Sequence, residues 1–212
     1  MDKLTSDQIT VILRKRIYDG ILAGGLALKQ EELASEFGVS RNPVRESLKT
    51  LKIEGLVRQE SPHGAVVVKH SIADVIEMLD IRIGLESRAL KLAIPNLSNA
   101  QVHYAEAILA KYDASNRPSE WSDLNLEFHL ALYRAANRPL LLKMIEDLVL
   151  STRRYTRVYI SRTLGRDGPQ EDHHALLAAF KQRDTAGAVA LLESHIMETQ
   201  KALLFASASV SL

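Results

Sequence analysis

The sequence predicts a mainly α-helical protein in two parts, a small N-terminal unit of helices with one β-hairpin and a larger, all-α antiparallel helical bundle. Two observations predict this division of the 212 residues. Apolar residues recur at helical spacing along most of the chain, and only residues 56–69 carry short β-branched runs around a turn. We therefore place a boundary near His70, which gives domains at residues 1–70 and 71–212.

The first helix is predicted from apolar residues at helical spacing, and Gly24 and Gly25 are expected to end it. These apolar residues are Ile9, Ile12, Leu13, Ile17 and Ile21. Two short helices around a tight turn follow in residues 31–54. Gly38 can adopt the left-handed conformation that ends the first of them, and Ser40 can cap the second.

The second of these short helices carries cations on its outer face. Arg41 and Arg45 lie four residues apart and therefore share one face, whereas Val44, Leu48 and Leu51 face the core. A helix whose outward side chains near the N-terminus are basic or amide groups fits the major groove of DNA. This pattern indicates a DNA-reading helix.

A β-hairpin is predicted directly after that helix. Residues 56–59 and 65–68 are short β-branched runs, and residues 61–64, Ser-Pro-His-Gly, form a typical turn sequence. Three helices followed by a hairpin make a winged helix-turn-helix unit, whose wing tip can reach the minor groove or the flanking phosphates.

The second part is expected to contain helices only, because every apolar pattern from residue 71 onward has the helical period. Prolines separate the helices, and short connections predict antiparallel neighbours in a bundle. We place the helices near residues 71–94, 98–113, 119–136, 139–164, 169–181 and 184–207.

Four residues of the second part have a spacing that suits a metal site, namely Asn125, His129, His173 and His195. Asn125 and His129 lie four residues apart on one predicted helix, so both project from the same face. Three imidazoles and an oxygen donor suit zinc, nickel or a similar divalent ion. The alternative is that these histidines lie in the core, hydrogen-bonded and without metal.

Two neighbouring residues compete for places in this site. His174 is a rival of His173, because adjacent helical residues point about 100° apart and only one can face the bundle axis. The spacing alone does not decide whether His173 or His174 is the candidate ligand. Asp123 is a rival of Asn125, but it lies six residues from His129 and well round the helix from it.

Composition limits the possible partners and locations. The formal net charge of +1 is too small to indicate a polyanion partner, so a nucleic-acid site must come from local arrangement. The absence of cysteine excludes disulfides and thiolate ligands. No apolar run approaches the roughly 18 residues of a membrane helix, and residues 1–8 do not resemble a signal peptide. We expect a cytoplasmic protein with no membrane partner.

Several motifs together resemble the GntR family of bacterial transcription regulators. In the first part they are residues 38–46, Leu48, Leu51, residues 54–57, His63 and Gly64. In the second part they are residues 125–129, Asn137, Pro139, His173, Asp184 and His195, which resemble the effector-binding and oligomerisation domain of the family's FadR-type branch. The motifs cover nearly the whole chain and favour His173 over His174.

The resemblance implies roles for individual residues. Contacts with DNA would come chiefly from Arg41 and Arg45, assisted by Ser40, Asn42, Lys49, His63 and Gly64. Arg82 would face the carboxylate of an organic-acid effector, and Asn137 would be a second effector-binding residue. The effector would lie beside a divalent metal held by Asn125, His129, His173 and His195. For Arg82, the alternative role is a surface ion pair with Glu86, four residues along the helix.

The chain departs from the family pattern at two positions. The usual residue of the branch at position 125 is aspartate, and the neutral amide of Asn125 contributes no charge to a metal site. We therefore expect weak retention of the metal and greater dependence on an anionic effector. Some members have a DNA-contacting arginine where Glu31 stands, so that contact is absent here.

We expect a ligand-responsive, sequence-specific DNA-binding transcription regulator. The simplest version is a repressor that acts as a homodimer on a near-palindromic operator and senses a small organic or sugar acid near zinc or nickel. One rival interpretation is a metal-dependent hydrolase fused to a DNA-binding unit, although Glu127 points away from the site and is a poor general base. Another rival is a regulator whose bundle only dimerises and whose histidines are structural.

Overall fold

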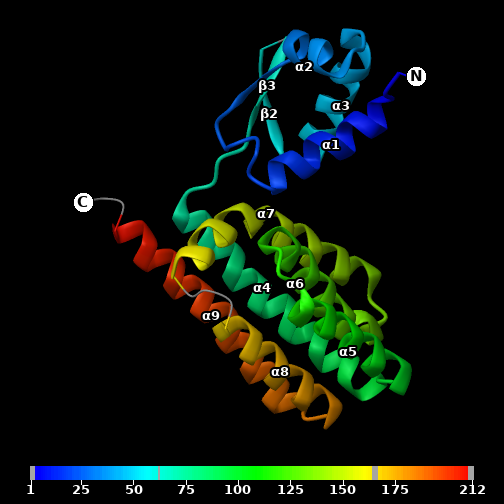
Figure 1. The fold of residues 1–212 in the computed structure, drawn as a ribbon, viewed down its shortest axis with the longest axis vertical. Coiled ribbons are helices and arrows are strands. Elements are labelled where there is room, and N and C mark those ends of the chain that lie inside the picture. Colours follow the sequence, from blue (N-terminus) through cyan, green and yellow to red (C-terminus); the bar gives the residue numbers. More distant parts are fainter. Residues whose placement is uncertain (1–2, 62, 164–166, 210–212) are drawn as a thin grey trace. The chain divides into compact units, whose positions relative to one another are not determined.

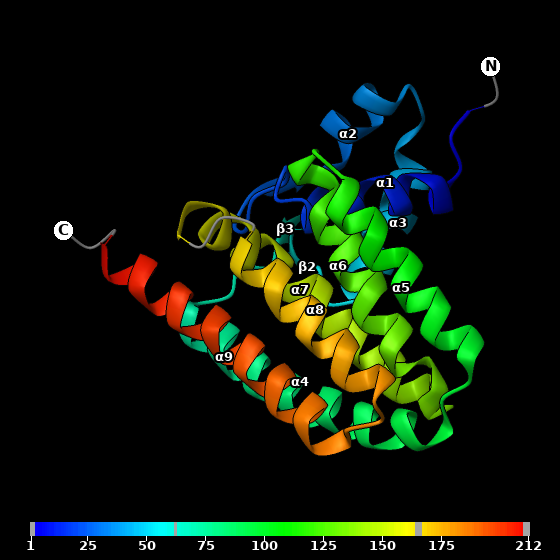
Figure 2. The same ribbon diagram turned by 60° about the horizontal axis from the view of Figure 1, so that its bottom comes forward.

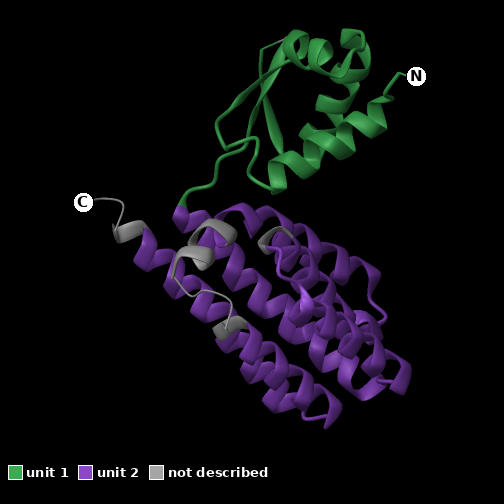
Figure 3. Ribbon diagram, in the orientation of Figure 1, with its two compact units in different colours: residues 1–71 green, residues 72–212 purple. Residues whose placement is uncertain are grey.

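A computed structural model describes residues 3–61, 63–163 and 167–209 of the chain. Two compact units make up the fold, Met1–Ser71 and Ile72–Leu212 (Figure 3). Each unit is built around its own hydrophobic core. The predicted fold class is confirmed, because a winged helix-turn-helix unit with a small sheet precedes a unit made of helices.

The described part of the first unit contains three α-helices and a three-stranded antiparallel sheet (Figure 1). Its elements are α1 (Ser6–Tyr18), β1 (Ala27–Lys29), α2 (Gln30–Phe37), α3 (Arg41–Ile53), β2 (Val57–Ser61) and β3 (Gly64–Val67). The predicted wing consists of β2 and β3. β3 is the central strand, and Ala65 pairs with Leu28 on one side and with Gln59 on the other.

The first helix is shorter than its apolar pattern predicts. A capping box at Thr5 begins α1. The helix ends at Tyr18, and Gly20 follows with a left-handed φ of 75°. Ile21 lies beyond this turn and is exposed. The prediction that the helix continues to Gly24 is therefore wrong, because the chain turns at Gly20 before the apolar pattern ends.

The turn between α2 and α3 has the predicted chemistry. Gly38 adopts a left-handed conformation with φ 63° and ψ 33°, and the backbone N–H of Val39 donates to the carbonyl of Ala34 at 3.0 Å. Ser40 is the N-cap residue of α3, although its side chain makes no capping hydrogen bond. Val44 and Leu51 are fully buried, so the opposite, basic face of α3 points outward.

In the described part of the second unit, every regular element is a helix. These are α4 (Ile72–Ala93), α5 (Asn99–Ala114), α6 (Pro118–Tyr133), α7 (Pro139–Thr163), α8 (Asp167–Lys181) and α9 (Thr185–Ser209), with short 3-10 helices η1 (Ile94–Asn96) and η2 (Arg134–Ala136). All six predicted helices are confirmed, and the one predicted at 119–136 ends in η2. In both Figure 1 and Figure 2, α9 lies along α4 with α8 beside it.

The core of the second unit positions the predicted histidines. Phe128 on α6, Tyr133 on α6 and Phe180 on α8 are fully buried. The rings of Phe128 and of Tyr112 on α5 both contact the ring of His173 on α8. Aromatic packing therefore fixes how α5, α6 and α8 meet.

A search of the described residues finds no helix with the length and apolar character needed to cross a membrane.

Candidate functional site

The N-terminal end of α3 presents the residues that are predicted to contact DNA. The side chains of Ser40, Arg41, Asn42, Arg45 and Lys49 are all exposed. The buried side chains of the same helix lie on the opposite face, as the pattern of α3 predicts. The first turns of the helix are thus available to a major groove.

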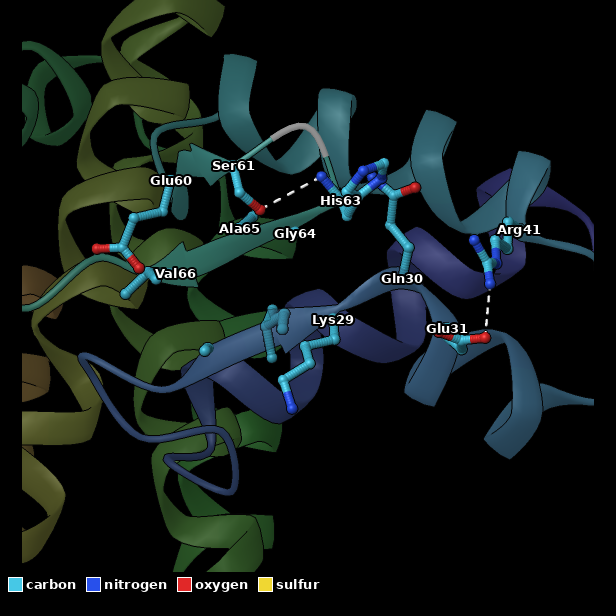
Figure 4. A pocket seen from close by; sticks show the side chains of 12 residues that line it. Lys29, Gln30, Glu31, Arg41, Glu60, Ser61, His63, Gly64, Ala65 and Val66 are labelled. Atoms are coloured by element: carbon cyan, nitrogen blue, oxygen red, sulfur yellow. Dashed lines mark hydrogen bonds and ion pairs between the residues drawn. The ribbon is translucent and has the colours of Figure 1, made fainter.

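Arg41 forms an ion pair within the unit. Its guanidinium Nη2 lies 2.5 Å from Oε1 of Glu31, near the start of α2, and both side chains are largely exposed (Figure 4). Glu31 stands where some family members have an additional arginine. In this chain the acidic residue instead neutralises the arginine of the recognition helix, in a solvent-exposed pair that is weak on its own.

Arg45 belongs to a second polar group on α3. Its guanidinium donates to the side-chain oxygen of Asn42 and also lies 3.3 Å from Oε1 of Glu46. The ammonium of Lys49 lies 3.0 Å from the same carboxylate oxygen of Glu46. The hydrogen bond of Lys49 and, next, that of Arg45 hold the pKa of Glu46 below its usual range. Glu46 therefore contacts two of the cations on this face, Arg45 and Lys49.

The wing tip and the recognition helix line one groove of about 560 Å³, which also includes strand β1 (Figure 4). Arg41 and His63 are both among its lining residues. The backbone N–H of His63 donates to Oγ of Ser61 at 3.3 Å, and the imidazole is exposed. A side chain at Gly64 would place Cβ 2.9 Å from the carbonyl oxygen of Leu28, so glycine allows β1 to approach.

Three histidines converge in the second unit, from three different helices. His129 on α6 and His173 on α8 are buried, and His195 on α9 is half-buried. The ring centroids lie 5.1 to 5.5 Å apart, and one nitrogen from each ring lies within 4.8 Å of the others. The three nitrogens are therefore close enough to one another to be candidate ligands of a single divalent ion, and zinc accepts imidazole nitrogen.

The nitrogen atoms of this histidine cluster fit a metal better than they fit a packed core. Among the described residues, Nε2 of His129 and both ring nitrogens of His173 are buried without a hydrogen-bond partner. Burial, and then the neighbouring His195, lowers the pKa of His173 to about 3. Burial, and then His173, holds the pKa of His129 well below its usual value. Both imidazoles are therefore neutral at pH 7, which is the form that binds metal.

These depressed pKa values predict that the metal-free protein loses stability as the pH falls from about 6.5 to 5. Below pH 6.5 the histidines of the unfolded chain take up protons, whereas His129 and His173 stay neutral in the folded state. Each such histidine lowers the free energy of unfolding by up to about 1.4 kcal/mol per pH unit. Urea denaturation across this range measures the slope, and a free energy of unfolding independent of pH would contradict it.

Two acidic residues and a tyrosine surround the cluster. Nδ1 of His195 lies 2.9 Å from Oδ2 of Asp172, which directs Nε2 of His195 away from the carboxylate, and this bond holds the pKa of Asp172 below its usual range. Nδ1 of His129 lies 3.3 Å from the hydroxyl of Tyr133, which donates to Oε2 of Glu86 at 2.7 Å. Burial, and then Glu86, raises the pKa of Tyr133 well above its usual value.

Arg82 lies in this same network. Its Nε donates to Oε1 of Glu86 at 2.7 Å, and the pair is buried, with the Glu86 side chain fully inaccessible. The alternative pairing of Arg82 with Glu86 therefore exists, but the expectation of a surface pair is wrong because α4 is covered here by its neighbours.

Sequence reasoning missed Tyr133 and Asp172. Their signals were a tyrosine four residues after His129 and an aspartate beside His173.

The rival residues lie elsewhere. His174 is exposed on α8, and its Nε2 lies 3.1 Å from Oδ2 of Asp113, whereas the neighbouring His173 lies in the cluster. Asp123 is exposed and pairs at 2.6 Å with the buried guanidinium of Arg153 on α7. Neither rival faces the histidines.

The two asparagines predicted for the site differ in their surroundings. Asn125 is half-buried on α6, one turn before His129. Asn137 is exposed and adopts a left-handed φ of 51° where η2 ends, which by itself explains an asparagine at this turn. Its contact with an effector stays a prediction.

Comparisons with known proteins cover both units. Residues 5–67 match the family model for bacterial regulatory proteins of the gntR family, and residues 77–198 match the model of the FCD domain. The chain is 28% identical over 196 residues to the uncharacterized HTH-type transcriptional regulator BphR of Paraburkholderia xenovorans, covering 87% of this chain and 79% of that protein. It is 29% identical over 181 residues to the HTH-type transcriptional repressor GlaR of Escherichia coli, covering 80% and 82%.

A solved structure shows the same fold along the chain. The structure of E. coli McbR/YncC aligns with a TM-score of 0.78 and 25% identity, covering 95% of this chain and 98% of that one. The residue weighed as a hydrolytic base, Glu127, is exposed and accepts a hydrogen bond from the hydroxyl of Tyr104 at 3.3 Å. The chain therefore belongs to the GntR family of bacterial regulatory proteins, as a DNA-binding transcription regulator with an FCD domain rather than an enzyme.

Proposed function

We propose that this regulator is a ligand-responsive repressor that senses a small organic or sugar acid beside a divalent metal ion in its second unit. One observation carries the proposal. Three imidazoles converge there, and buried nitrogens of His129 and His173 have no hydrogen-bond partner among the described residues. An unpaired buried polar atom costs free energy, which coordination of a metal would recover.

The proposed DNA interface combines the outer face of α3 with the wing. Its residues are Ser40, Arg41, Asn42, Arg45, Lys49, His63 and Gly64. In a homodimer, two copies of α3 would enter successive major grooves of a near-palindromic operator, with the half-site spacing set by the dimer. Repression is the favoured outcome because the relative GlaR is named a repressor.

The metal site would be formed by His129, His173 and His195, with Asn125 as an oxygen donor. Zinc and nickel both accept imidazole nitrogen, and a site with few protein ligands leaves positions for a carboxylate of the effector. Bound there, the ion would supply positive charge that attracts an anionic ligand. Because Asn125 brings no negative charge, the metal would be held weakly until such a ligand arrives.

Changing Asn125 to aspartate should tighten metal binding. The carboxylate adds a negative charge one turn from His129, and affinity in metal sites rises with the number of charged ligands, so we expect a gain on the order of 10-fold. Chelator competition with zinc on metal-free protein measures the change. Asn116→Asp adds the same charge at an exposed position before α6 and should have no effect. Equal affinity for the wild type and Asn125→Asp would exclude position 125 as a ligand.

Arg82 is the proposed partner of the effector carboxylate. It is buried in the same hydrogen-bond network as His129, and its Nε donates to Glu86. The carboxylate of an effector would either share this guanidinium with Glu86 or take the place of Glu86 beside it. The planar guanidinium has several N–H donors, so it can form both arrangements. Asn137 is retained as a second proposed contact.

Titration calorimetry with organic and sugar acids, run beside operator binding, tests the sensing function. We expect an acid that binds only when zinc or nickel is present and that changes operator affinity, typically by about 5- to 150-fold. Acids that bind without changing operator affinity would contradict the coupling. If no acid binds while the operator is still recognised, the second unit serves only for dimerisation and the sensing proposal fails.

A further inference from the structure

A chain of hydrogen bonds runs through the buried interior from Arg82 to His129. Nε of Arg82 donates to Oε1 of Glu86 at 2.7 Å, and the hydroxyl of Tyr133 donates to Oε2 of the same carboxylate at 2.7 Å. Nδ1 of His129 lies 3.3 Å from the oxygen of that hydroxyl. Glu86 and Tyr133 are fully buried and His129 is 3% exposed, so water does not compete for these contacts.

The directions of these hydrogen bonds follow from the ion pair between Arg82 and Glu86, because a guanidinium can only donate and a carboxylate can only accept. Arginine can only donate, so Glu86 accepts from Arg82 through one oxygen. The other oxygen accepts the single hydroxyl proton of Tyr133. The hydroxyl oxygen then has only lone pairs left, and its contact with His129 is a hydrogen bond only if Nδ1 of His129 carries the proton.

We propose that Glu86 and Tyr133 are positioning residues that fix the tautomer of His129, with the proton on Nδ1 and a bare lone pair on Nε2. Nε2 is the buried nitrogen of His129 that has no partner among the described residues, and it belongs to the ring that lies 5.2 Å and 5.5 Å from the rings of His173 and His195. The role of this tautomer in metal binding rests on the proposed function. The tautomer itself is a property of the metal-free protein and can be measured without a metal.

The tautomer matters because a neutral imidazole binds a metal only through its unprotonated nitrogen. The partner of the other ring nitrogen decides which nitrogen that is, and loss of such a partner typically lowers metal affinity by about 10- to 100-fold. Here the partner of Nδ1 of His129 is the hydroxyl oxygen of Tyr133, and the hydroxyl proton of Tyr133 is donated to the carboxylate of Glu86. Glu86 therefore acts on the metal site without touching it.

Glu86→Gln should reverse the tautomer. Because Arg82 offers only donors, the amide oxygen introduced at position 86 must face Arg82 and the amide NH₂ must face Tyr133. The tyrosine oxygen then accepts from the amide, and its proton turns to Nδ1 of His129. Nε2 becomes the protonated nitrogen. Tyr133→Phe removes the connection altogether and should leave a mixture of the two tautomers.

Nitrogen NMR of ¹⁵N-histidine-labelled, metal-free protein at neutral pH measures the tautomer, with His129→Gln used to assign the signal. We expect Nδ1–H in the wild type, Nε2–H in Glu86→Gln and both forms in Tyr133→Phe. Nε2–H in the wild type would overturn the proposal without any variant. Glu127→Gln and Tyr104→Phe are matched controls, because they make the same changes in the exposed hydrogen bond between Tyr104 and Glu127. Both should keep the wild-type tautomer.

Zinc affinity, measured by chelator competition on the same proteins, tests the consequence. We expect about a 10- to 100-fold loss in Glu86→Gln and Tyr133→Phe and no loss in the two controls. A reversed tautomer with unchanged zinc affinity would overturn the positioning role. If the tautomers behave as expected but the wild type binds no zinc, the hydrogen-bond chain is supported and the proposed metal function fails, so the two failures are distinguishable.

Discussion

Arg45→Ala is expected to weaken operator binding by about 1–3 kcal/mol, roughly 5- to 150-fold. Arg45 is exposed on the outer face of α3, and its guanidinium is held toward Asn42 on the same face. A side chain placed this way would reach a base edge or a phosphate when the helix enters the major groove. Footprinting or electrophoretic mobility shift with the operator measures the loss, and binding equal to the wild type would refute the assignment.

The control for this experiment is Arg117→Ala. Arg117 is an exposed arginine in the second unit that pairs with Glu120 at 2.9 Å, so its removal deletes the same charge and one surface ion pair. Operator affinity should not change. An equal loss in both variants would attribute the effect of Arg45 to overall charge rather than to contact with DNA.

His129→Ala is expected to abolish stoichiometric metal binding. His129 supplies one of the three imidazoles in the cluster, and its removal should cost more than the roughly 10- to 100-fold typical of a residue that only supports a ligand. Elemental analysis of protein purified without chelator or a nickel column measures the metal content. Wild-type protein that carries no metal and binds none on titration would contradict the site itself.

The matched control is His174→Ala. His174 lies on α8 next to the ligand candidate His173, yet its ring is exposed and its Nε2 faces Asp113. This variant should keep its metal, whereas His173→Ala should lose it. Metal loss in His174→Ala alone would reverse the choice between the two neighbours.

Helical periodicity predicted most of the fold because long helices repeat the same signal many times. The turn at Gly38 was also predictable, since few residues adopt its left-handed φ of 63°. β1 was not predictable. It is only three residues long, and it forms because β3, far along the chain, offers free backbone groups. The end of α1 at Tyr18 was missed because Ile21 continues the apolar spacing but lies in solvent.

The candidate metal site was only partly predictable. Spacing indicated that His129, His173 and His195 could meet, but the burial that leaves their nitrogens unpaired depends on packing by Phe128 and Tyr112. The roles of Glu86 and Tyr133 depend on a contact between α4 and α6, and no local pattern encodes a contact between distant helices. Sequence reasoning found the candidate ligands and missed the residues that orient them.

The ion pair between Arg41 and Glu31 has a consequence for how operator affinity depends on salt. Free cations on a DNA-binding face each displace one condensed counterion from the phosphates, so the slope of log affinity against log salt counts them. Arg41 already holds a carboxylate at 2.5 Å, and a phosphate that takes this arginine must first release Glu31. The released carboxylate of Glu31 then lies near the DNA phosphates and keeps some cations there. Fewer counterions are therefore released in total, and the gain in entropy is smaller. The salt dependence of operator binding should therefore be shallower than the number of arginine and lysine contacts suggests, and Glu31→Gln should steepen it.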